Sequence, residues 1–357
     1  MVEKDDIWIT KDDYLNVYII GYENQGESII ISIGDKFIGV IDCYKVNNLF
    51  ETKRILKEYG VPLDFVCWTH VDWDHTYGLS ELREFINNST AFIIPEGYTA
   101  TEVRSMFLDS NNYKHKEYKK IYDTLDDISP DNFISANNNT EIYNFKFKYE
   151  EAEYDFLMKS FAPLSKIVRS LGSKNLKDTI LGLKSKDDFG REWYEGYNRF
   201  NNLFSVGLEI TLKLKFEDIR VCLTGDLDNE TIDNMNPKAI NRIFTRNTIL
   251  KIPHHGSNNA NKLIDFNYDK SIAFDYAVST SFKSAGLPNS SILEKYNRYG
   301  NVYRTDKENC NKYGIVKYTY PIVNFQNKKD LPKELELFGD AGKVMSHQKA
   351  HQRVITK

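Results

Sequence analysis

Residues 69–75 of this 357-residue chain read Thr69-His70-Val71-Asp72-Trp73-Asp74-His75, and they directly follow the apolar run Phe65-Val66-Cys67-Trp68. The apolar run predicts a short buried strand, and α/β proteins place functional side chains in the polar loop that follows such a strand. Within six positions this loop carries four side chains of metal-ligand type: His70, Asp72, Asp74 and His75. Imidazoles and carboxylates at this spacing can hold one divalent cation or two neighbouring ones. The alternative for the stretch alone is a solvated acidic turn with two incidental histidines.

Two later loops repeat the arrangement of a strand followed by ligand-type residues. Residues 220–223 predict a strand that leads into Thr224-Gly225-Asp226, and residues 249–252 predict one that leads into Pro253-His254-His255-Gly256-Ser257. The three loops contain four of the seven histidines of the chain. Histidines scattered over a surface would not gather in this way, so we expect the loops to meet at one site.

Composition indicates a globular protein of a reducing compartment. Hydrophobic residues make up 41% of the chain and charged residues 27%, enough for a sizeable core. The formal charge of −4 gives no overall cationic field, so binding to a nucleic acid would need local patches. The four cysteines are far apart and form no C-x-x-C pair, which argues against a disulfide framework. We see neither a signal peptide nor an apolar run of membrane-spanning length, and we expect a cytoplasmic protein without a membrane partner.

Hydrophobic periodicity predicts alternating strands and helices, hence an α/β fold. Besides the strands already named, the predicted strands are residues 16–22, 28–33, 37–43, 91–94, 154–158, 203–216, 274–279, 302–305 and, as the last one, 313–320. The predicted helices are residues 46–59, 76–86, 98–108, 113–125, 163–171, 228–235 and 290–299. Residues 126–140 are rich in Asp, Asn and Ser and predict a loop.

Taken together, these motifs resemble the metallo-β-lactamase superfamily, and within it the nuclease domain of ComEC-type DNA-uptake proteins. The first loop has an H-x-D-x-D-H form of the superfamily's H-x-H-x-D-H motif. The other matching stretches are Gln25-Gly26-Glu27-Ser28, Asp42 at the end of the hairpin, Asn202-Leu203-Phe204-Ser205, Leu223-Thr224-Gly225-Asp226, Pro253 to Ser257, and residues 290–306. The resemblance covers about residues 16–320 apart from the middle region.

The resemblance implies an αββα sandwich with metal ions at one edge between two sheets. It places this hydrolase domain at residues 1–325, with an insertion at about 97–150 and a polar loop at about 174–201. Residues 326–357 are predicted to form a C-terminal tail.

Two departures from the superfamily pattern concern the metal ligands. Asp72 stands where the superfamily has its second histidine, and Gly286-Leu287-Pro288-Asn289 lacks the histidine that many members carry there. Leu287 cannot bind a metal ion, but in relatives with an H-H-G-S loop a histidine from that loop can be the last ligand. Either His254 or His255 could take this role, and we favour His255, with His254 facing the substrate.

The charges of these side chains lead to a hypothesis of two divalent metal ions. His70 and Asp72 would hold one ion, while Asp74, His75 and His255 would hold the other, with Asp226 bridging the two. Three carboxylates among six ligands favour Mn²⁺ or Mg²⁺, with Zn²⁺ as the alternative. Two ions about 3.5–4 Å apart would lower the pKa of a shared water and hold it as hydroxide.

The remaining polar side chains receive supporting roles. We expect Asp74, Asp226 and His254 to be catalytic, with His254 either protonating the leaving oxygen or binding the phosphate. Ser257 would donate a hydrogen bond to the substrate. Asn202 would either do the same or serve only as a turn residue. Asp42 would orient a ligand histidine through its second ring nitrogen, or would be a simple turn acid.

The first functional hypothesis is a nuclease that cleaves DNA with a metal-bridged hydroxide. The resemblance further implies a stand-alone relative acting in bacterial anti-phage defence beside a partner ATPase. The first alternative is a hydrolase of a small phosphodiester, such as a phosphocholine ester or a cyclic nucleotide. The second is a metal-binding module that has lost activity. Nothing in the sequence sets the oligomeric state.

Overall fold

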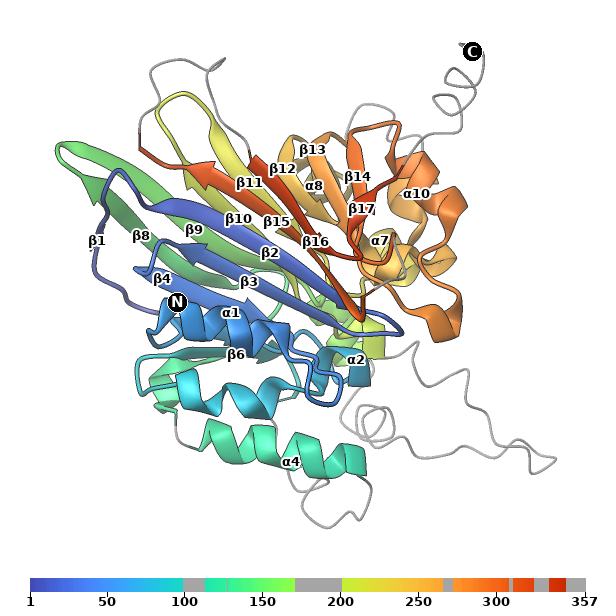
Figure 1. Ribbon diagram of the computed structural model, residues 1–357, viewed down its shortest axis with the longest axis horizontal. Helices are drawn as coiled ribbons and strands as arrows, with labels where there is room; N and C mark the ends of the chain where they lie inside the picture. Colours follow the sequence, from blue (N-terminus) through green and yellow to red (C-terminus); the bar gives the residue numbers. More distant parts are fainter. Residues whose placement is uncertain are drawn as a thin grey trace.

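Two β-sheets lie face to face, and helices cover the outer face of each sheet (Figure 1). The computed structural model describes residues 1–98, 113–126, 128–170, 201–265, 272–307, 311–323 and 334–344. The predicted helix at 98–108 and the predicted polar loop at 174–201 fall almost entirely outside these ranges. In the described part the layers confirm the predicted α/β sandwich.

The eight-stranded sheet has the order β16-β15-β2-β3-β4-β5-β6-β7. In that order its strands are Glu334–Gly339, Tyr313–Pro321, Tyr14–Tyr22, Glu27–Ile33, Phe37–Ile41, Phe65–Cys67, Ala91–Pro95 and Phe133–Ala136. Strands β16 to β4 are antiparallel, whereas β4 to β7 are parallel to their neighbours. Because β4 and β5 run in the same direction, Asp42 and the loop 69–75 emerge at the same edge of the sheet.

The nine-stranded sheet has the order β1-β8-β9-β10-β11-β12-β13-β14-β17. In that order its strands are Ile7–Trp8, Glu141–Tyr149, Ala152–Ala162, Gly207–Lys213, Asp218–Leu223, Asn247–Lys251, Phe274–Ser279, Asn301–Arg304 and Gly342–Lys343. Strands β11 to β14 are parallel. The loops 224–226 and 253–257 therefore leave the sheet at one edge, after β11 and β12.

Helices form the two outer layers. Over the eight-stranded sheet lie α1 (Glu51–Tyr59), α2 (Trp73–Thr76), the 3₁₀ helix η1 (Leu79–Phe85) and α4 (Tyr113–Leu125). Over the nine-stranded sheet lie α7 (Asn229–Asn234), α8 (Pro237–Phe244), α9 (Lys262–Asp265) and α10 (Ser290–Tyr296). Short 3₁₀ turns are η2 (Pro130–Asn132), η3 (Pro253–Gly256), η4 (Asn258–Ala260) and η5 (Lys283–Ala285), and residues 165–170 are also helical. None of the helices in the described ranges combines the length and the apolar character that a bilayer crossing requires.

Each pair of adjacent layers encloses its own hydrophobic core. Strand β3 shows how the pleat divides its side chains: Ile29 and Ile31 face the core between the sheets, and Ile30 faces the core under α1 and α4. Because both faces are covered, every residue of β3 is buried, and its four isoleucines do not alternate with exposed residues. The two sheets are thereby held in a fixed relation, and the loops at their common edge are held with them.

Phe37 lies at the centre of an aromatic group between the sheets. The centroid of its ring is 5.7 Å from that of Phe65, 5.4 Å from that of Tyr143 and 5.0 Å from that of Phe156. We expect Phe37→Ala to lower the free energy of unfolding by about 3–5 kcal/mol, because it removes transfer energy and leaves a cavity. Urea denaturation measures this, with Phe216→Ala as the control, since Phe216 is 43% exposed. Equal effects of the two substitutions would contradict this placement of Phe37.

Several predicted elements differ from the structure, each for a local reason. The predicted helix at 46–59 begins only at Glu51, because Asn47 has a left-handed backbone (φ 52°). The predicted helix at 76–86 is instead η1, preceded by the single turn of α2. The predicted loop at 126–140 was wrong over β7, where pairing with β6 supplies the hydrogen bonds of a short strand.

The chain also forms strands outside the predicted set. Residues 313–320 are not the last strand, because β16 and β17 follow within the stretch predicted as a tail. The side chains of β16 are exposed or half-buried at the sheet edge, so its sequence lacks an apolar pattern. Strand β8, within the predicted insertion, pairs with β9 and β1 in the nine-stranded sheet. The division into domain, insertion and tail stays a prediction.

Candidate metal centre

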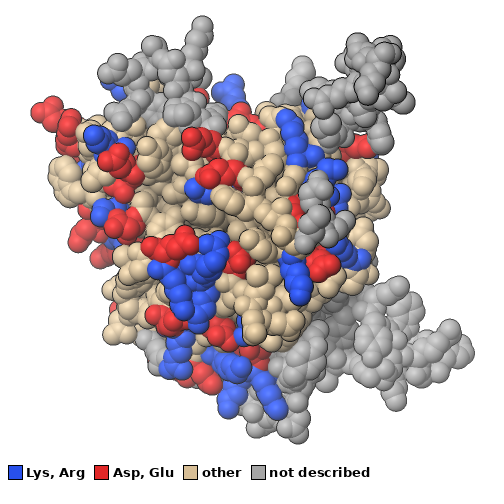
Figure 2. Space-filling model, viewed as in Figure 1, with Lys and Arg blue, Asp and Glu red and all other residues tan. Residues whose placement is uncertain are grey.

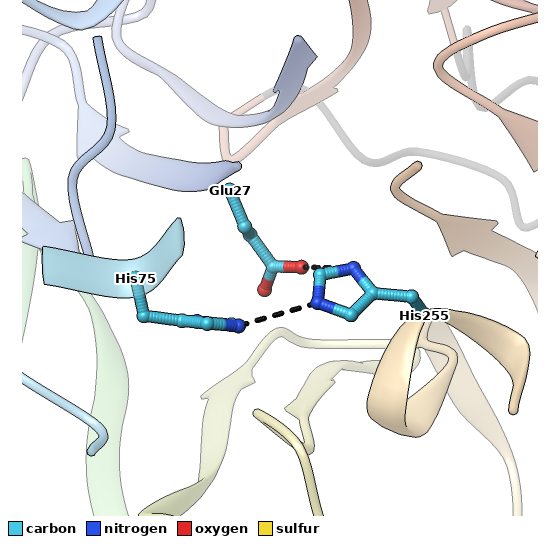
Figure 3. A group of neighbouring side chains, drawn as sticks. All are labelled: Glu27, His75 and His255. Carbon is cyan, nitrogen blue, oxygen red and sulfur yellow. Dashed lines mark hydrogen bonds and ion pairs between the residues drawn. The ribbon is translucent and has the colours of Figure 1, made fainter. Parts of the chain in front are cut away.

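Four side chains from the three predicted loops face one another at the common edge of the sheets. These are Asp74, His75, Asp226 and His255, here called the inner cluster. The Nε2 atom of His75 lies 3.5 Å from Asp74 Oδ2, 3.4 Å from Asp226 Oδ1 and 3.4 Å from His255 Nε2. The Nε2 atom of His255 lies 3.1 Å from Asp74 Oδ2 and 3.4 Å from Asp226 Oδ2. Figure 3 shows the imidazoles of His75 and His255 pointing toward each other.

The inner cluster has the spacing of a metal site. Two ligands at about 2.0–2.1 Å from a tetrahedral zinc ion are about 3.3–3.4 Å from each other. The five distances above lie close to that value. In addition, Asp74 Oδ2, Asp226 Oδ1 and His70 Nε2 are buried without a hydrogen-bond partner. Buried polar atoms rarely stay unsatisfied, so the donor set fits a divalent cation.

Opposite charges within the inner cluster shift the pKa values of its members. Burial by itself would raise the pKa of Asp74, but the His75 and His255 imidazoles lower this pKa to about 2. Burial would lower the pKa of His255, but the Asp226 and Asp74 carboxylates raise it to about 9. In the same way the pKa of Asp226 is held well below its ordinary value and that of His75 well above. The two carboxylates thus require a positive charge beside them, either protons on the imidazoles or a metal ion.

Asp42 holds His75 in place from behind. Its Oδ2 atom accepts a hydrogen bond from His75 Nδ1 at 2.6 Å, and Thr69 donates to the same carboxylate through its backbone N–H and its hydroxyl. A carboxylate can only accept, so Nδ1 of His75 carries a proton, and Nε2 is the nitrogen left to face the inner cluster and to bind a metal ion. This is the geometry expected of the orienting role predicted for Asp42.

Unusual backbone conformations place Asp226 and His255. Gly225 is left-handed (φ 51°), and a Cβ atom there would lie 2.4 Å from Ser205 Oγ, which accepts the backbone N–H of Asp226 at 2.9 Å. His254 and His255 are both left-handed as well, with φ of 47° and 50°. Such non-glycine residues cost about 1–3 kcal/mol each and concentrate at functional sites. The loop turns sharply here, and His255 is directed into the protein.

His70 and Asp72 form a second pair beside the inner cluster. Nε2 of His70 is 3.5 Å from Asp72 Oδ2, and the ring centroids of His70 and His75 are 4.3 Å apart. The Asn201 amide donates to Asp72 Oδ1 at 2.7 Å. All six predicted ligands therefore lie in one region, while their roles, including the bridging role of Asp226, stay a prediction.

Two further carboxylates come close to the histidines without facing the inner cluster. Ligand-type atoms of Glu27, His75 and His255 lie within 4.8 Å of one another, as do those of Asp42, His70 and His75. Asp42 is engaged by Nδ1 of His75, and Glu27 lies on the Nδ1 side of His255, where Lys251 pairs with it. We therefore place both acids behind the ligands.

A cavity of about 590 Å³ opens beside these residues. Its lining residues are Asn202, Asp228, Asn229, Glu230, His254, Ser257, Asn259, Phe282, Ala285 and Leu287. The amide of Asn202 is 3.4 Å from each ring nitrogen of His254, and Ser257 Oγ accepts the Asn259 backbone N–H at 3.1 Å. The three residues predicted to contact substrate, Asn202, His254 and Ser257, therefore line one cavity. Leu287 lines the same cavity.

Sequence reasoning missed Glu27, Lys251 and Thr280 as parts of the site. Lys251 gave a signal, because it is a charged residue within an apolar strand, and it is fully buried. Glu27 lies in a stretch that matched a motif, but only as the start of a strand. Thr280 carried no signal in the sequence.

Comparisons with known proteins find distant structural neighbours. No family model matches the chain, and no curated protein matches it. Among solved structures the chain is similar to Rm3 metallo-beta-lactamase, with 8% identity, coverage of 76% of this chain and 80% of that chain, and a TM-score of 0.30. It is also similar to the metallo-beta-lactamase GOB-18 from Elizabethkingia meningoseptica, with 14% identity, coverage of 67% and 72%, and a TM-score of 0.27. Because the sequence identities and TM-scores are this low, only the geometry of this chain's own site indicates its chemistry.

Proposed function

We propose that the chain is a metal-dependent phosphodiesterase of the metallo-β-lactamase superfamily and that its substrate is DNA. The observation that carries the proposal is the inner cluster, whose buried carboxylate oxygens Asp74 Oδ2 and Asp226 Oδ1 have no hydrogen-bond partner. It lies beside a cavity lined by amide, imidazole and hydroxyl groups. The motifs of the sequence support the same class of enzyme.

In this proposal Asp74, His75, Asp226 and His255 would hold one divalent ion, and His70 with Asp72 would hold a second. Bound divalent ions lower the pKa of water and neutralise the charge of phosphate oxygens, which is the chemistry that phosphodiester hydrolysis requires. The carboxylates of Asp74 and Asp226 keep the site anionic, and Asp42 keeps the lone pair of His75 directed inward.

His254 binds the phosphate rather than supplying a proton to the leaving oxygen. Burial lowers the pKa of His254, which favours its neutral imidazole. A neutral imidazole has one N–H that can donate to a phosphate oxygen. Asn202 and Ser257 border the same cavity and supply further donors.

Basic side chains in a neighbouring cavity, rather than the overall charge, support a long anionic substrate. The face in Figure 2 shows basic and acidic side chains interspersed, without a field of one sign. A second cavity of about 350 Å³ shares Leu287 with the first and is lined by Lys283, Arg304 and Lys307, with Asp306 bound to Arg304. A DNA strand crossing the metal centre could place a neighbouring phosphate there. The proposal also includes a partner ATPase and a role in anti-phage defence. Only the sequence resemblance supports these two parts.

The test compares two substrates with Mn²⁺, Mg²⁺ or Zn²⁺ added to metal-free protein. We expect plasmid DNA to be cleaved with Mn²⁺ and cleavage to stop when EDTA is added, because carboxylates are half of the ligands. Turnover of bis-p-nitrophenyl phosphate with intact plasmid would instead support the small-phosphodiester alternative. Metal binding without turnover of either would indicate a binding module. Activity with Zn²⁺ alone would reject the preference for a hard cation.

A further inference from the structure

Behind His255 lies a buried chain of hydrogen bonds and an ion pair that the proposed chemistry does not use. Thr280 Oγ1 is 2.8 Å from His255 Nδ1 and donates to Glu27 Oε2 at 2.6 Å. Lys251 Nζ lies 2.7 Å from the same Glu27 oxygen. All three residues are buried, with Lys251 and Thr280 at 0% exposure. We call Thr280, Glu27 and Lys251 the His255 support.

The direction of the hydrogen bonds follows from the chemistry of each group. Glu27 accepts from the Lys251 ammonium and from the Thr280 hydroxyl, because a carboxylate paired with a buried ammonium has no proton to give. The Thr280 hydroxyl proton is committed to Glu27, so Thr280 Oγ1 can only accept from His255 Nδ1–H. In the neutral imidazole the lone pair of His255 is therefore on Nε2, the atom that faces Asp74 and Asp226.

The His255 support also ties the two sheets together at the metal centre. Glu27 is the first residue of β3 in the eight-stranded sheet. Lys251 ends β12, and Thr280 follows β13, both in the nine-stranded sheet. Lys251 also donates to the backbone carbonyl of Ile252, two residues before His254. The ion pair therefore joins the loop that carries His255 to the sheet that carries the loop of Asp74 and His75.

We propose that Thr280, Glu27 and Lys251 are positioning residues that fix the tautomer and the ring orientation of His255 for metal binding. The proposal rests on the metal centre of the proposed function. Asp42 and Thr69 serve His75 in the corresponding way, so each histidine of the inner cluster has its own carboxylate on the Nδ1 side. Partners of this kind raise metal affinity by about 10–100-fold.

Thr280 is the residue to change, because it carries no charge. Removing Glu27 or Lys251 would leave the other charge buried and unpaired, which destabilises a protein strongly. Thr280→Val keeps the shape of the side chain and removes the hydroxyl, whereas Thr280→Ser keeps the hydroxyl. Thr90→Val is the matched control, because Thr90 is also fully buried and its hydroxyl donates to the Leu63 carbonyl, outside the metal centre.

Two measurements on the full chain test the proposal. Isothermal titration with Mn²⁺ and with Zn²⁺ should show an affinity about 10–100-fold lower for Thr280→Val, while Thr280→Ser and Thr90→Val stay within about threefold of the wild type. In metal-free protein labelled with ¹⁵N-histidine and held at about pH 10, where the His255 imidazole is neutral, the ¹⁵N signals should place the ring proton on Nδ1 in the wild type and in Thr280→Ser, and on Nε2 in Thr280→Val.

Equal metal affinity in the wild type and Thr280→Val would overturn the proposal, as would an unchanged His255 signal. An effect of Thr90→Val as large as that of Thr280→Val would also overturn it, because general destabilisation would then explain both. A wild-type protein that binds neither metal would instead remove the proposed function, and the His255 signal would still report whether Thr280 orients the ring.

Discussion

Asp226→Asn is expected to lower metal-activated phosphodiester hydrolysis by about a thousandfold or more. The two carboxylate oxygens of Asp226 lie 3.4 Å from the Nε2 atoms of His75 and His255, respectively. Asparagine keeps the shape but removes the negative charge, and it directs an amide N–H toward an imidazole that should be a metal ligand. Loss of a residue at the reacting centre commonly costs several orders of magnitude in kcat. The readouts are kcat/KM with Mn²⁺ and the metal content of the purified protein.

Asp64→Asn is the matched control for this substitution. Asp64 is also largely buried, but it precedes β5 at the end opposite the metal loop, where it accepts the Ile38 backbone N–H and binds Lys4. We expect it to affect the free energy of unfolding and to leave kcat/KM within about threefold. If Asp226→Asn kept wild-type activity while Asp64→Asn did not, the metal centre would have to be placed elsewhere.

The strand-and-loop pattern was enough to predict which segments meet at the site. Residues 65–68, 220–223 and 249–252 each read as a strand followed by ligand-type residues, and the structure has β5, β11 and β12 there. Parallel strands send their carboxyl ends to the same edge, so the convergence of the loops follows from local sequence. The choice of His255 over His254 as the inward residue agrees with the geometry, because the backbone turn directs His255 to Asp74 and Asp226.

The partners behind His255 could not be predicted, because they depend on pairing across the fold. Thr280 and Glu27 are 253 positions apart in the chain and meet only when the two sheets pack. Strand β2 pairs with β15, nearly 300 residues later, and polarity alone could not show that β16 extends the same sheet. Short strands such as β7 owe their conformation to a neighbour and show little periodicity of their own.

The free energy of unfolding of the metal-free protein is expected to fall as the pH rises from about 6.5 to about 9. Burial alone would lower the pKa of His255, but Asp226 and Asp74 raise it to about 9, and the pKa of His75 is raised as well. An unfolded histidine has a pKa of about 6.5, so the stabilisation by His255 is complete below that pH and is lost as the pH rises through 9. For His255 alone the change is on the order of 3 kcal/mol. Urea denaturation in EDTA from pH 6 to 9 measures it.

Saturating Mn²⁺ should reverse this trend, because the metal ion takes the place of the protons. Its binding needs neutral imidazoles at His75 and His255, so binding releases protons and strengthens with pH. A ligand that binds only the folded state adds to the free energy of unfolding in proportion to the logarithm of its affinity. The gain caused by Mn²⁺ should therefore be smallest near pH 6 and grow toward pH 8.5.

His255→Gln should weaken both the pH dependence of the free energy of unfolding in EDTA and the gain in that free energy from the metal ion. A gain from Mn²⁺ that stayed constant across this range would show that the ion binds away from these histidines, because only ligands that exchange protons for metal couple the two equilibria.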